Sequence, residues 1–261
     1  MSQTKLLTGL DAGVLTLTLD GPAKRNALNE EVMAALDAAL DRAEQDAAVR
    51  AVVLAAVGTA FCAGMDVGQL RNVTSATGED NLKHAMTMAG RMSRLAMLSK
   101  PTIAAVQGPA WGGGVGLVAA CDIAIAVDSA RFALTEVRLG LLPGLVAPMM
   151  ASAIGTRAAQ RLLLTGQSID AQEALRLGLV HEVVPAENLA AAVAETALRL
   201  KAGSTATIAA TKRLLADPAL KFPDPNSVRP IAEAVMAHRG TPDAQEGIAA
   251  FLEKRKPSWA V

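Results

Sequence analysis

Three short apolar segments constrain the fold of this chain more than any other feature. They are Arg50–Val57 (RAVVLAAV), Thr102–Val106 (TIAAV) and Cys121–Val127 (CDIAIAV). Strands that are apolar on both faces are typical of a parallel sheet that helices cover on both sides. A fourth segment, Val14–Leu19 (VLTLTL), alternates apolar and polar residues and also predicts a strand. Because helical segments lie between these strands, we expect an α/β fold with parallel strands.

Helical periodicity fills the intervals between the strands and dominates toward the C-terminus. We also expect a mobile loop over Gln69–Asp80 and a short strand at Arg131–Leu134. Strand signals thin out after Val184, so residues 1–200 are expected to form the core and residues 201–261 a helical extension. Helices are expected from the Asn29 cap to Gln45, at Asn81–Leu98, from the glycine patch described below to Ala120, and at Ala147–Ile154, Arg157–Thr165, Ala171–Leu177, Ala186–Lys201, Thr205–Ala216, Pro230–His238 and Pro242–Lys254.

Composition excludes several classes of function. The 261 residues carry 25 Lys and Arg against 25 Asp and Glu, and aromatic residues make up 2%. We therefore expect no nucleic-acid partner, and no apolar run reaches the roughly 18 residues that a membrane span needs. Cys62 and Cys121 form no CxxC pair and are expected to be reduced, buried thiols of a cytoplasmic protein. The histidines His84, His181 and His238 lie far apart, so no metal site is predicted.

The densest glycine patch, Gly108–Gly116 (GPAWGGGVG), follows a buried strand and precedes a helix. Glycines let backbone N–H groups approach a ligand, and a helix N-terminus favours negative charge. The patch therefore predicts a site for an anion or a developing oxyanion, with close helix–strand packing as the alternative. The dinucleotide pattern GxGxxG/A fits Gly114–Ala119 only weakly, because the preceding strand ends well before its first glycine.

Glu136 is a carboxylate in the largely apolar segment Phe132–Gly140 (FALTEVRLG). Burial there would raise its pKa toward the working pH, as a general acid or base requires. An ion pair with Arg138, or an exposed helix start, is the alternative interpretation. The glycine patch upstream favours the catalytic one.

Taken in order, these segments and several others resemble the crotonase (enoyl-CoA hydratase/isomerase) superfamily over essentially the whole chain. The common order of the motifs, rather than any one of them, makes the resemblance specific. The motifs are Phe61–Asp66 (FCAGMD), Pro101–Gly108 (PTIAAVQG), Gly112–Gly114, Cys121–Ile123, Leu139–Gly144 (LGLLPG), Leu164–Gly166, Ala171–Ala174, Gly178–Val180 and Phe251–Arg255.

The resemblance implies a spiral of ββα units in residues 1–200, holding an acyl-CoA thioester, and a C-terminal helical region in residues 201–261 that forms a homotrimer or a dimer of trimers. Coenzyme A would enter as part of the substrate, and no separate cofactor is implied. The thioester oxygen would accept hydrogen bonds from the N–H groups of Met65 and Gly113, in agreement with the glycine patch as an oxyanion site. Further implied substrate or CoA contacts, with a solvated surface as the alternative for the cations, are Lys24, Arg25, Ala27, Ala63, Asp66, Val67, Gly116 and Lys254.

The chain departs from the family pattern at Gly116. Family hydratases commonly use two glutamates, one after the glycine run and one at the position of Glu136, and here Gly116 replaces the first. A single carboxylate can relay the proton of water to C2, which is hydration, or move a proton between C2 and C4, which is isomerisation. We expect an enoyl-CoA hydratase with Glu136 as its lone acid/base; an enoyl-CoA delta-isomerase and a catalytically silent acyl-CoA-binding member are the alternatives. Asp66 and Glu79 are candidate substitutes for the missing glutamate.

Four methionines crowd the helix expected at Asn81–Leu98, namely Met86, Met88, Met92 and Met97. Deformable methionine side chains suit an acyl pocket. Ordinary core or interface packing is the interpretation that the sequence favours.

Overall fold

A six-stranded sheet forms the centre of the computed structural model, which describes residues 3–66, 68–69, 77–217 and 225–260. Neighbouring strands are parallel, except that β1 pairs antiparallel with β2. These parallel, largely buried strands confirm the α/β class. In spatial order the strands are β1 (Lys5–Asp11), β2 (Val14–Asp20), β3 (Ala51–Ala56), β4 (Thr102–Val106), β6 (Ile123–Val127) and β9 (Glu182–Val184).

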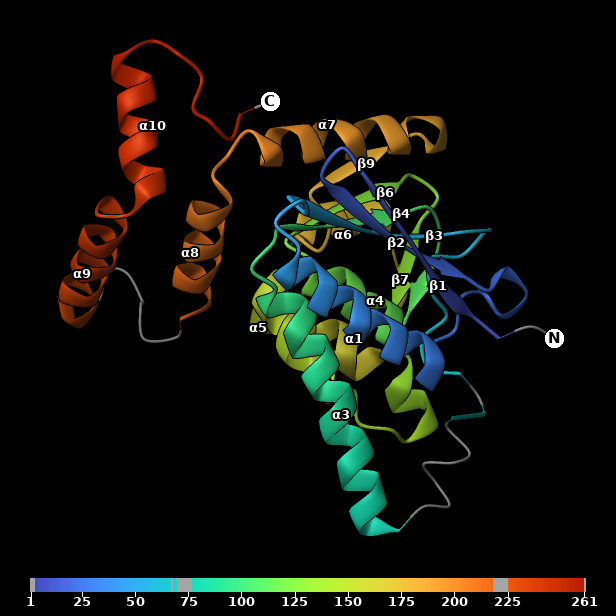
Figure 1. Cartoon of the computed structure of the whole chain (residues 1–261). Coiled ribbons are helices and arrows are strands. Elements are labelled where there is room, and N and C mark those ends of the chain that lie inside the picture. Colours follow the sequence, from blue (N-terminus) through green and yellow to red (C-terminus); the bar gives the residue numbers. More distant parts are fainter. Residues whose placement is uncertain (1–2, 67, 70–76, 218–224, 261) are drawn as a thin grey trace.

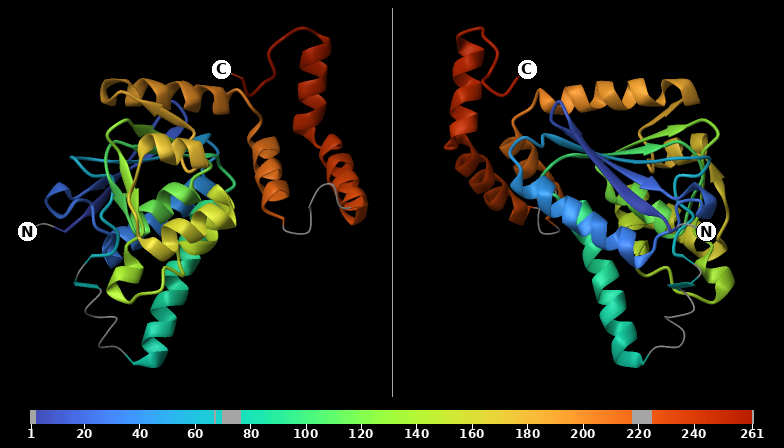
Figure 2. Two further views of the ribbon diagram at one scale, coloured as in Figure 1. Left: turned by 180° about the vertical axis from the view of Figure 1, so that it is seen from behind. Right: turned by 45° about the vertical axis from the view of Figure 1, so that its right-hand side comes forward.

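Helices cover both faces of this sheet (Figure 1). Helix α7 (Leu189–Lys201) crosses one face and packs on β3, β4 and β6, while α1 (Glu30–Gln45) and α4 (Gly113–Ala120) pack on the other. Figure 2 shows the same layers from two further directions. The double cover explains why the central strands are apolar on both faces.

A second sheet of three short strands places the candidate site. It contains β5 (Ala110–Trp111), β7 (Arg131–Ala133) and β8 (Ile169–Asp170), and β5 runs parallel to β7. The chain passes from β4 through β5 into α4, and from β6 through β7 into a 3-10 turn, η2 (Glu136–Leu139). Since Trp111 pairs with Ala133, the residues that follow these two strands become neighbours.

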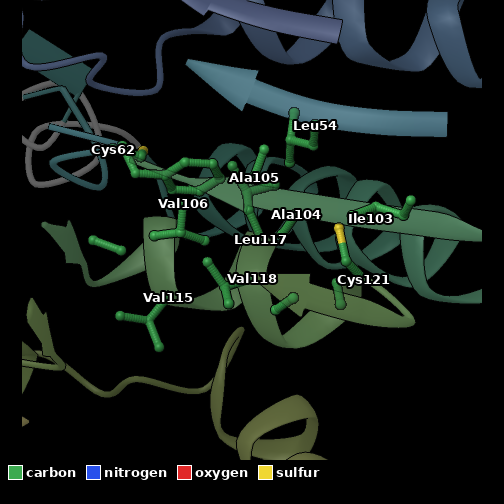
Figure 3. Close-up of a cluster of buried hydrophobic side chains, with 14 of the residues drawn as sticks. Leu54, Cys62, Ile103, Ala104, Ala105, Val106, Val115, Leu117, Val118 and Cys121 are labelled. Carbon is green, nitrogen blue, oxygen red and sulfur yellow. The ribbon is translucent and has the colours of Figure 1, made fainter. Parts of the chain in front are cut away.

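The core around β4 and α4 is aliphatic (Figure 3). Ile103 and Val106 of β4 and Leu117 and Val118 of α4 are all buried. A helix that is apolar all round has to lie inside the protein, and α4 does so. Its packing fixes the position of its N-terminus, which carries the glycine patch.

The remaining helices lie close to their expected positions. The break expected between the two helices on either side of Gly155 is a kink in one element, where Gly155 has φ of 75°. The bounds are α3 (Gly78–Met97), α5 (Ala147–Thr165), α6 (Ala171–Leu177), α8 (Thr205–Ala216), α9 (Val228–Arg239) and α10 (Pro242–Leu252).

One expectation was wrong at its described end, and one strand near the N-terminus was not predicted. The loop expected over Gln69–Asp80 is helical from Gly78, because the Thr77 side chain accepts a hydrogen bond from the Asp80 N–H and caps α3 there; residues 70–76 lie outside the described part. Strand β1 was not expected, since KLLTGLD has no clear alternation. It forms because its hairpin with β2 pairs Lys5 with Asp20 through to Asp11 with Val14.

Helices α8, α9 and α10, which we call the C-terminal arm, stand to one side of the core (Figures 1 and 2). The Arg50 guanidinium donates to the carbonyl oxygens of Lys201 and Gly203, both at 2.9 Å, where the arm begins. The Lys212 ammonium of α8 reaches the Asp122 carboxylate at 2.6 Å. Among the helices that the structure describes, none has the length and apolar character needed to cross a membrane.

Candidate active site

The loop that follows β3 meets β5 and the residues after it, at the edge of the second sheet. Cys62 and Ala110 form a parallel bridge, in which the Trp111 N–H donates to the Cys62 carbonyl oxygen at 2.8 Å. Met65 and Gly113 each lie three residues beyond this bridge, so the two loops carry them to the same place. Close approach requires a glycine at position 64, where φ is 84° and a Cβ would lie 2.9 Å from the Trp111 carbonyl oxygen.

The N–H groups of Met65 and Gly113 donate to no acceptor in the part of the chain that the structure describes. Gly113 is the first residue of α4, where a helix leaves its N–H groups without intrahelical partners. Leu28 bonds the residues on either side of Met65, namely the Gly64 carbonyl at 2.7 Å and the Asp66 N–H at 2.9 Å. The Met65 N–H therefore points away from Leu28, and both donors are available to a ligand.

Glu136 begins η2, three residues after the end of β7 at Ala133, and its carboxylate lies against Gly112. A Cβ built on Gly112 would be 2.8 Å from Glu136 Oε1. Glu136 Oε2 is buried and has no hydrogen-bond partner among the described residues. Burial raises the pKa of Glu136 above the ordinary 4.5, because apolar surroundings disfavour its charged form.

The ion pair considered between Glu136 and Arg138 is wrong. The Arg138 guanidinium instead donates to the Thr165 carbonyl oxygen at 3.4 Å. No neighbouring cation therefore offsets the effect of burial on Glu136, within the described residues.

An apolar cavity of about 290 Å³ brings Met65, Gly113 and Glu136 together. Of the described side chains that line it, only Glu136 is ionisable. The His, Cys, Asp and Glu side chains of the described residues form no group of three or more that could hold a metal ion. The apolar walls come from Leu28, Met33, Met88, Met92, Leu139, Leu141, Leu142, Pro143, Leu145 and Val146.

Gly116, on α4, lies behind two residues of the cavity wall, and a larger side chain at this position would press on them. A Cβ there would lie 3.0 Å from Val146 Cγ2 and 3.5 Å from Met92 Cε. Val146 and Met92 both line the cavity. A carboxylate side chain at position 116 would therefore require these apolar groups to shift.

The candidate substitutes for a second acid lie elsewhere. The Asp66 carboxylate pairs with the Lys24 ammonium at 3.0 Å, and the hydrogen bond from Lys24 lowers the pKa of Asp66. Glu79 is exposed in the first turn of α3. Neither residue lines the cavity.

The structure gathers most of the predicted CoA contacts in two adjoining segments. The Ala63 N–H donates to the Arg25 carbonyl oxygen at 2.9 Å, and Lys24 pairs with Asp66. Ala27 is buried beside them, whereas the Arg25 side chain is exposed. Of these residues, Ala63 lines the cavity.

One predicted contact, Lys254, is not brought to this place within the chain. The predicted contact at Val67 lies outside the described residues. Lys254 is exposed just after α10, in a part of the chain that stands beside the core (Figure 1).

Several wall residues were missed from the sequence. Leu145 and Val146 enter the cavity because the segment after η2 folds back over α4, which no local pattern indicates. The apolar run after Glu136 was a local signal for this wall. Its residue Leu142 lines the cavity although its side chain is 89% exposed. Of the methionines considered for an acyl pocket, Met88 and Met92 are buried and line the cavity. The others on this helix do not line it.

The chain is similar to known proteins over nearly its whole length. The family model for enoyl-CoA hydratase/isomerase matches residues 9–261. A putative enoyl-CoA hydratase of Thermus thermophilus is 39% identical over 245 residues, which cover 94% of this chain and 96% of that protein.

Solved structures agree with this. An enoyl-CoA hydratase of Shewanella pealeana superimposes with a TM-score of 0.92 at 36% identity, covering 97% of this chain and 95% of that one. A putative enoyl-CoA hydratase/isomerase (crotonase) of Legionella pneumophila gives 0.89 at 37% identity, covering 99% of this chain and 100% of that one. These matches confirm the expected ββα spiral. The chain therefore belongs to the enoyl-CoA hydratase/isomerase (crotonase) family, as an enzyme of the hydratase type of lyase.

Proposed function

We propose that this enzyme adds water reversibly to a 2-enoyl-CoA thioester, with Glu136 as its lone acid/base. The observation that carries the proposal is the buried Oε2 of Glu136, which lies at an apolar cavity and has no hydrogen-bond partner in the described part of the chain. The same cavity is lined by Met65 and Gly113, whose N–H groups are the proposed donors to the thioester oxygen. Donors of this kind stabilise the negative charge that develops on that oxygen during addition.

The reaction balances with one carboxylate. The ionised Glu136 accepts a proton from water while the water oxygen bonds to C3, and the electrons of the C2–C3 double bond move to the thioester oxygen. When the carbonyl re-forms, C2 takes the proton from Glu136. The enzyme is regenerated, and the product is the 3-hydroxyacyl-CoA. No separate cofactor is needed, because water and the CoA ester supply every atom.

An enoyl-CoA isomerase is the second candidate, and the wall beside Gly116 favours it. Apolar groups of Val146 and Met92 lie against Gly116, and among the described residues Glu136 is the only carboxylate that lines the cavity. In this reaction Glu136 takes a proton from C2 of a 3-enoyl-CoA and returns it at C4.

Turnover of two substrates separates these functions. Crotonyl-CoA loses its enone-thioester absorbance if it is hydrated, whereas an isomerase leaves crotonyl-CoA unchanged and converts a 3-enoyl-CoA. A protein that turns over neither substrate but binds acyl-CoA is the silent binding member.

Glu136→Gln tests the role of the carboxylate. We expect crotonyl-CoA turnover to fall by about 10²–10⁴-fold, with CoA-ester binding largely kept, because a positioned acid/base contributes that much. Glu187→Gln, at an exposed glutamate, is the matched control and should leave the rate unchanged. Full activity in Glu136→Gln would contradict the proposal.

We further propose that residues 201–261 form the contact surface of a homotrimer or a dimer of trimers. The support is the large number of exposed apolar side chains that the C-terminal arm carries, including Leu215, Val235, Met236, Ile248, Phe251 and Leu252. In such an assembly the exposed Lys254 is a candidate to reach the CoA phosphates of a neighbour. Both cysteines are free and buried, in keeping with a cytoplasmic location.

A further inference from the structure

Helix α3 supplies two methionines to the cavity wall from the point where it enters the core. From Gly78 to Thr87 the helix has no buried residue, and in Figure 1 this half extends beyond the core. Met88 is the first buried residue of α3, and Arg91 is the next. The shape of the wall at Met88 therefore depends on what holds α3 at this turn.

Arg91 is the group that holds it. Its side chain is 8% exposed, and it spans two helices: Nη2 donates to Glu30 Oε1 and Nε to Asp37 Oδ2, both at 2.7 Å and both on α1. The remaining nitrogen, Nη1, lies 3.7 Å from Met88 Sδ and donates to it. Because the guanidinium is planar and all three of its nitrogens are engaged, it has one orientation and presents one N–H to the sulfur.

Met88 needs such a partner. Methionine has three rotatable bonds and fills space adaptably, so a methionine wall has no single shape unless something fixes its rotamer. The contact from Arg91 fixes the sulfur of a side chain whose surface lines the cavity.

We propose that Arg91 is a positioning residue for substrate selection: by holding the Met88 thioether, it sets the length and branching of the acyl chain that the cavity accepts. The inference rests on the proposed function, since it assumes that the cavity takes the acyl group of a CoA thioester.

Arg94 provides a matched control on the same helix. It also pairs with Asp37, at 3.0 Å, and with Asp41, so it contributes to the attachment of α3 to α1. Its hydrogen bonds go to these carboxylates and not to a residue that lines the cavity. A change caused only by loosening the helix would appear in variants of both arginines.

The test is calorimetric binding of saturated butyryl-, isovaleryl-, hexanoyl- and octanoyl-CoA. Each additional methylene that becomes buried strengthens binding about fourfold, so affinity rises with chain length until the chain meets the wall. We expect Arg91→Lys and Met88→Ala to move that limit toward longer chains and to change the octanoyl-to-butyryl affinity ratio by about fivefold or more. Arg94→Gln should leave the ratio unchanged, and Arg91→Lys should add nothing to it in a Met88→Ala background.

Arg91→Lys keeps a cation beside its two carboxylates, and a melting curve verifies that it folds. Glu30→Gln, at an exposed carboxylate, tests the same attachment without altering a buried charge and should give a smaller shift in the same direction. Equal weakening of all four ligands in Arg91→Lys, or an effect that persists without the Met88 side chain, would overturn the inference. A wild-type protein that binds none of the four would instead overturn the proposed function.

Discussion

The position of the Glu136 carboxylate depends on Gly112, a neighbouring residue that has no side chain. Gly112 has φ of 51° and no side chain, which lets the Glu136 carboxylate lie against the backbone at the N-terminus of α4. An alanine there would place its methyl group 2.8 Å from Glu136 Oε1, so the carboxylate would have to move. The sequence shows a glycine run and a distant glutamate; the structure shows that one makes room for the other.

The raised pKa of Glu136 predicts the pH dependence of the reaction. Hydration needs the ionised carboxylate, so kcat/KM should rise with pH along a limb whose midpoint lies above the ordinary 4.5. A pH–rate profile on crotonyl-CoA measures it. A midpoint at or below 4.5 would contradict the half-buried environment of this group, which has no cation beside it among the described residues.

The raised pKa of Glu136 also affects folding stability: activity should rise with pH, whereas the contribution of Glu136 to stability should fall. Between pH 4.5 and the higher folded-state pKa, the native state holds a proton that the unfolded chain has lost, so the contribution of Glu136 to stability falls as pH rises through that window. Above it, the buried charge is a cost that glutamine avoids. We expect Glu136→Gln to melt at a temperature equal to or above that of the wild type at pH 7, although it is inactive. A large fall in its melting temperature would show that the carboxylate is structural.

At the scale of elements, α4 packs against the start of α5 where Gly116 lies beside Val146. Gly116→Glu would add a second carboxylate, yet its side chain would have to displace Val146 and Met92. We expect this variant to lose stability by about 1–3 kcal/mol and to lose activity, because overpacking a well-filled wall costs that much. Thermal melting and crotonyl-CoA turnover measure both effects.

A second substitution isolates the cause of this loss. Val146→Ala in the Gly116→Glu background reopens the space, so the double variant should regain part of the lost stability. Higher turnover and an unchanged melting temperature in Gly116→Glu alone would show that the wall yields easily.

Elements with a strong period or a cap were predictable, and those that depend on a partner were not. The three apolar strands and most helices follow local patterns that the structure confirms. Strand β1 exists because β2 pairs with it, and its own residues, KLLTGLD, do not specify a strand. The early start of α3 is different, because a local signal for it exists in the sequence: Thr77 caps the helix through the Asp80 N–H.

At the scale of the whole molecule, Arg50 joins the core to the C-terminal arm. Its guanidinium also donates to Thr205 Oγ1 at 2.8 Å and to the Trp259 carbonyl oxygen at 3.1 Å. One side chain therefore connects the approach to β3, the start of α8 and the end of the described chain.

Loss of this connection should weaken assembly more than it weakens the core. Arg50→Ala removes four hydrogen bonds from a charged donor, each worth about 1.5–3 kcal/mol. We expect the wild type to have the mass of a trimer or hexamer by light scattering, and Arg50→Ala to dissociate at higher protein concentration. Arg42→Ala, which removes a long, exposed ion pair with Asp46, is the control. An unchanged mass for Arg50→Ala at every concentration would contradict this role of Arg50.

The sequence by itself determined the α/β class, the positions of the apolar core strands along the chain, the family, and the identity of Glu136 and the glycine run as candidates. These follow from the apolar period, from turn and cap residues and from ordered motifs, which act over a few neighbours along the chain. Only the tertiary structure decided that Glu136 Oε2 has no hydrogen-bond partner among the described residues, that Val146 lies against Gly116, and that Arg91 reaches both α1 and Met88. The physical reason is that burial, pKa and side-chain contact depend on residues far apart in sequence, and these meet only once the sheets and helices have packed.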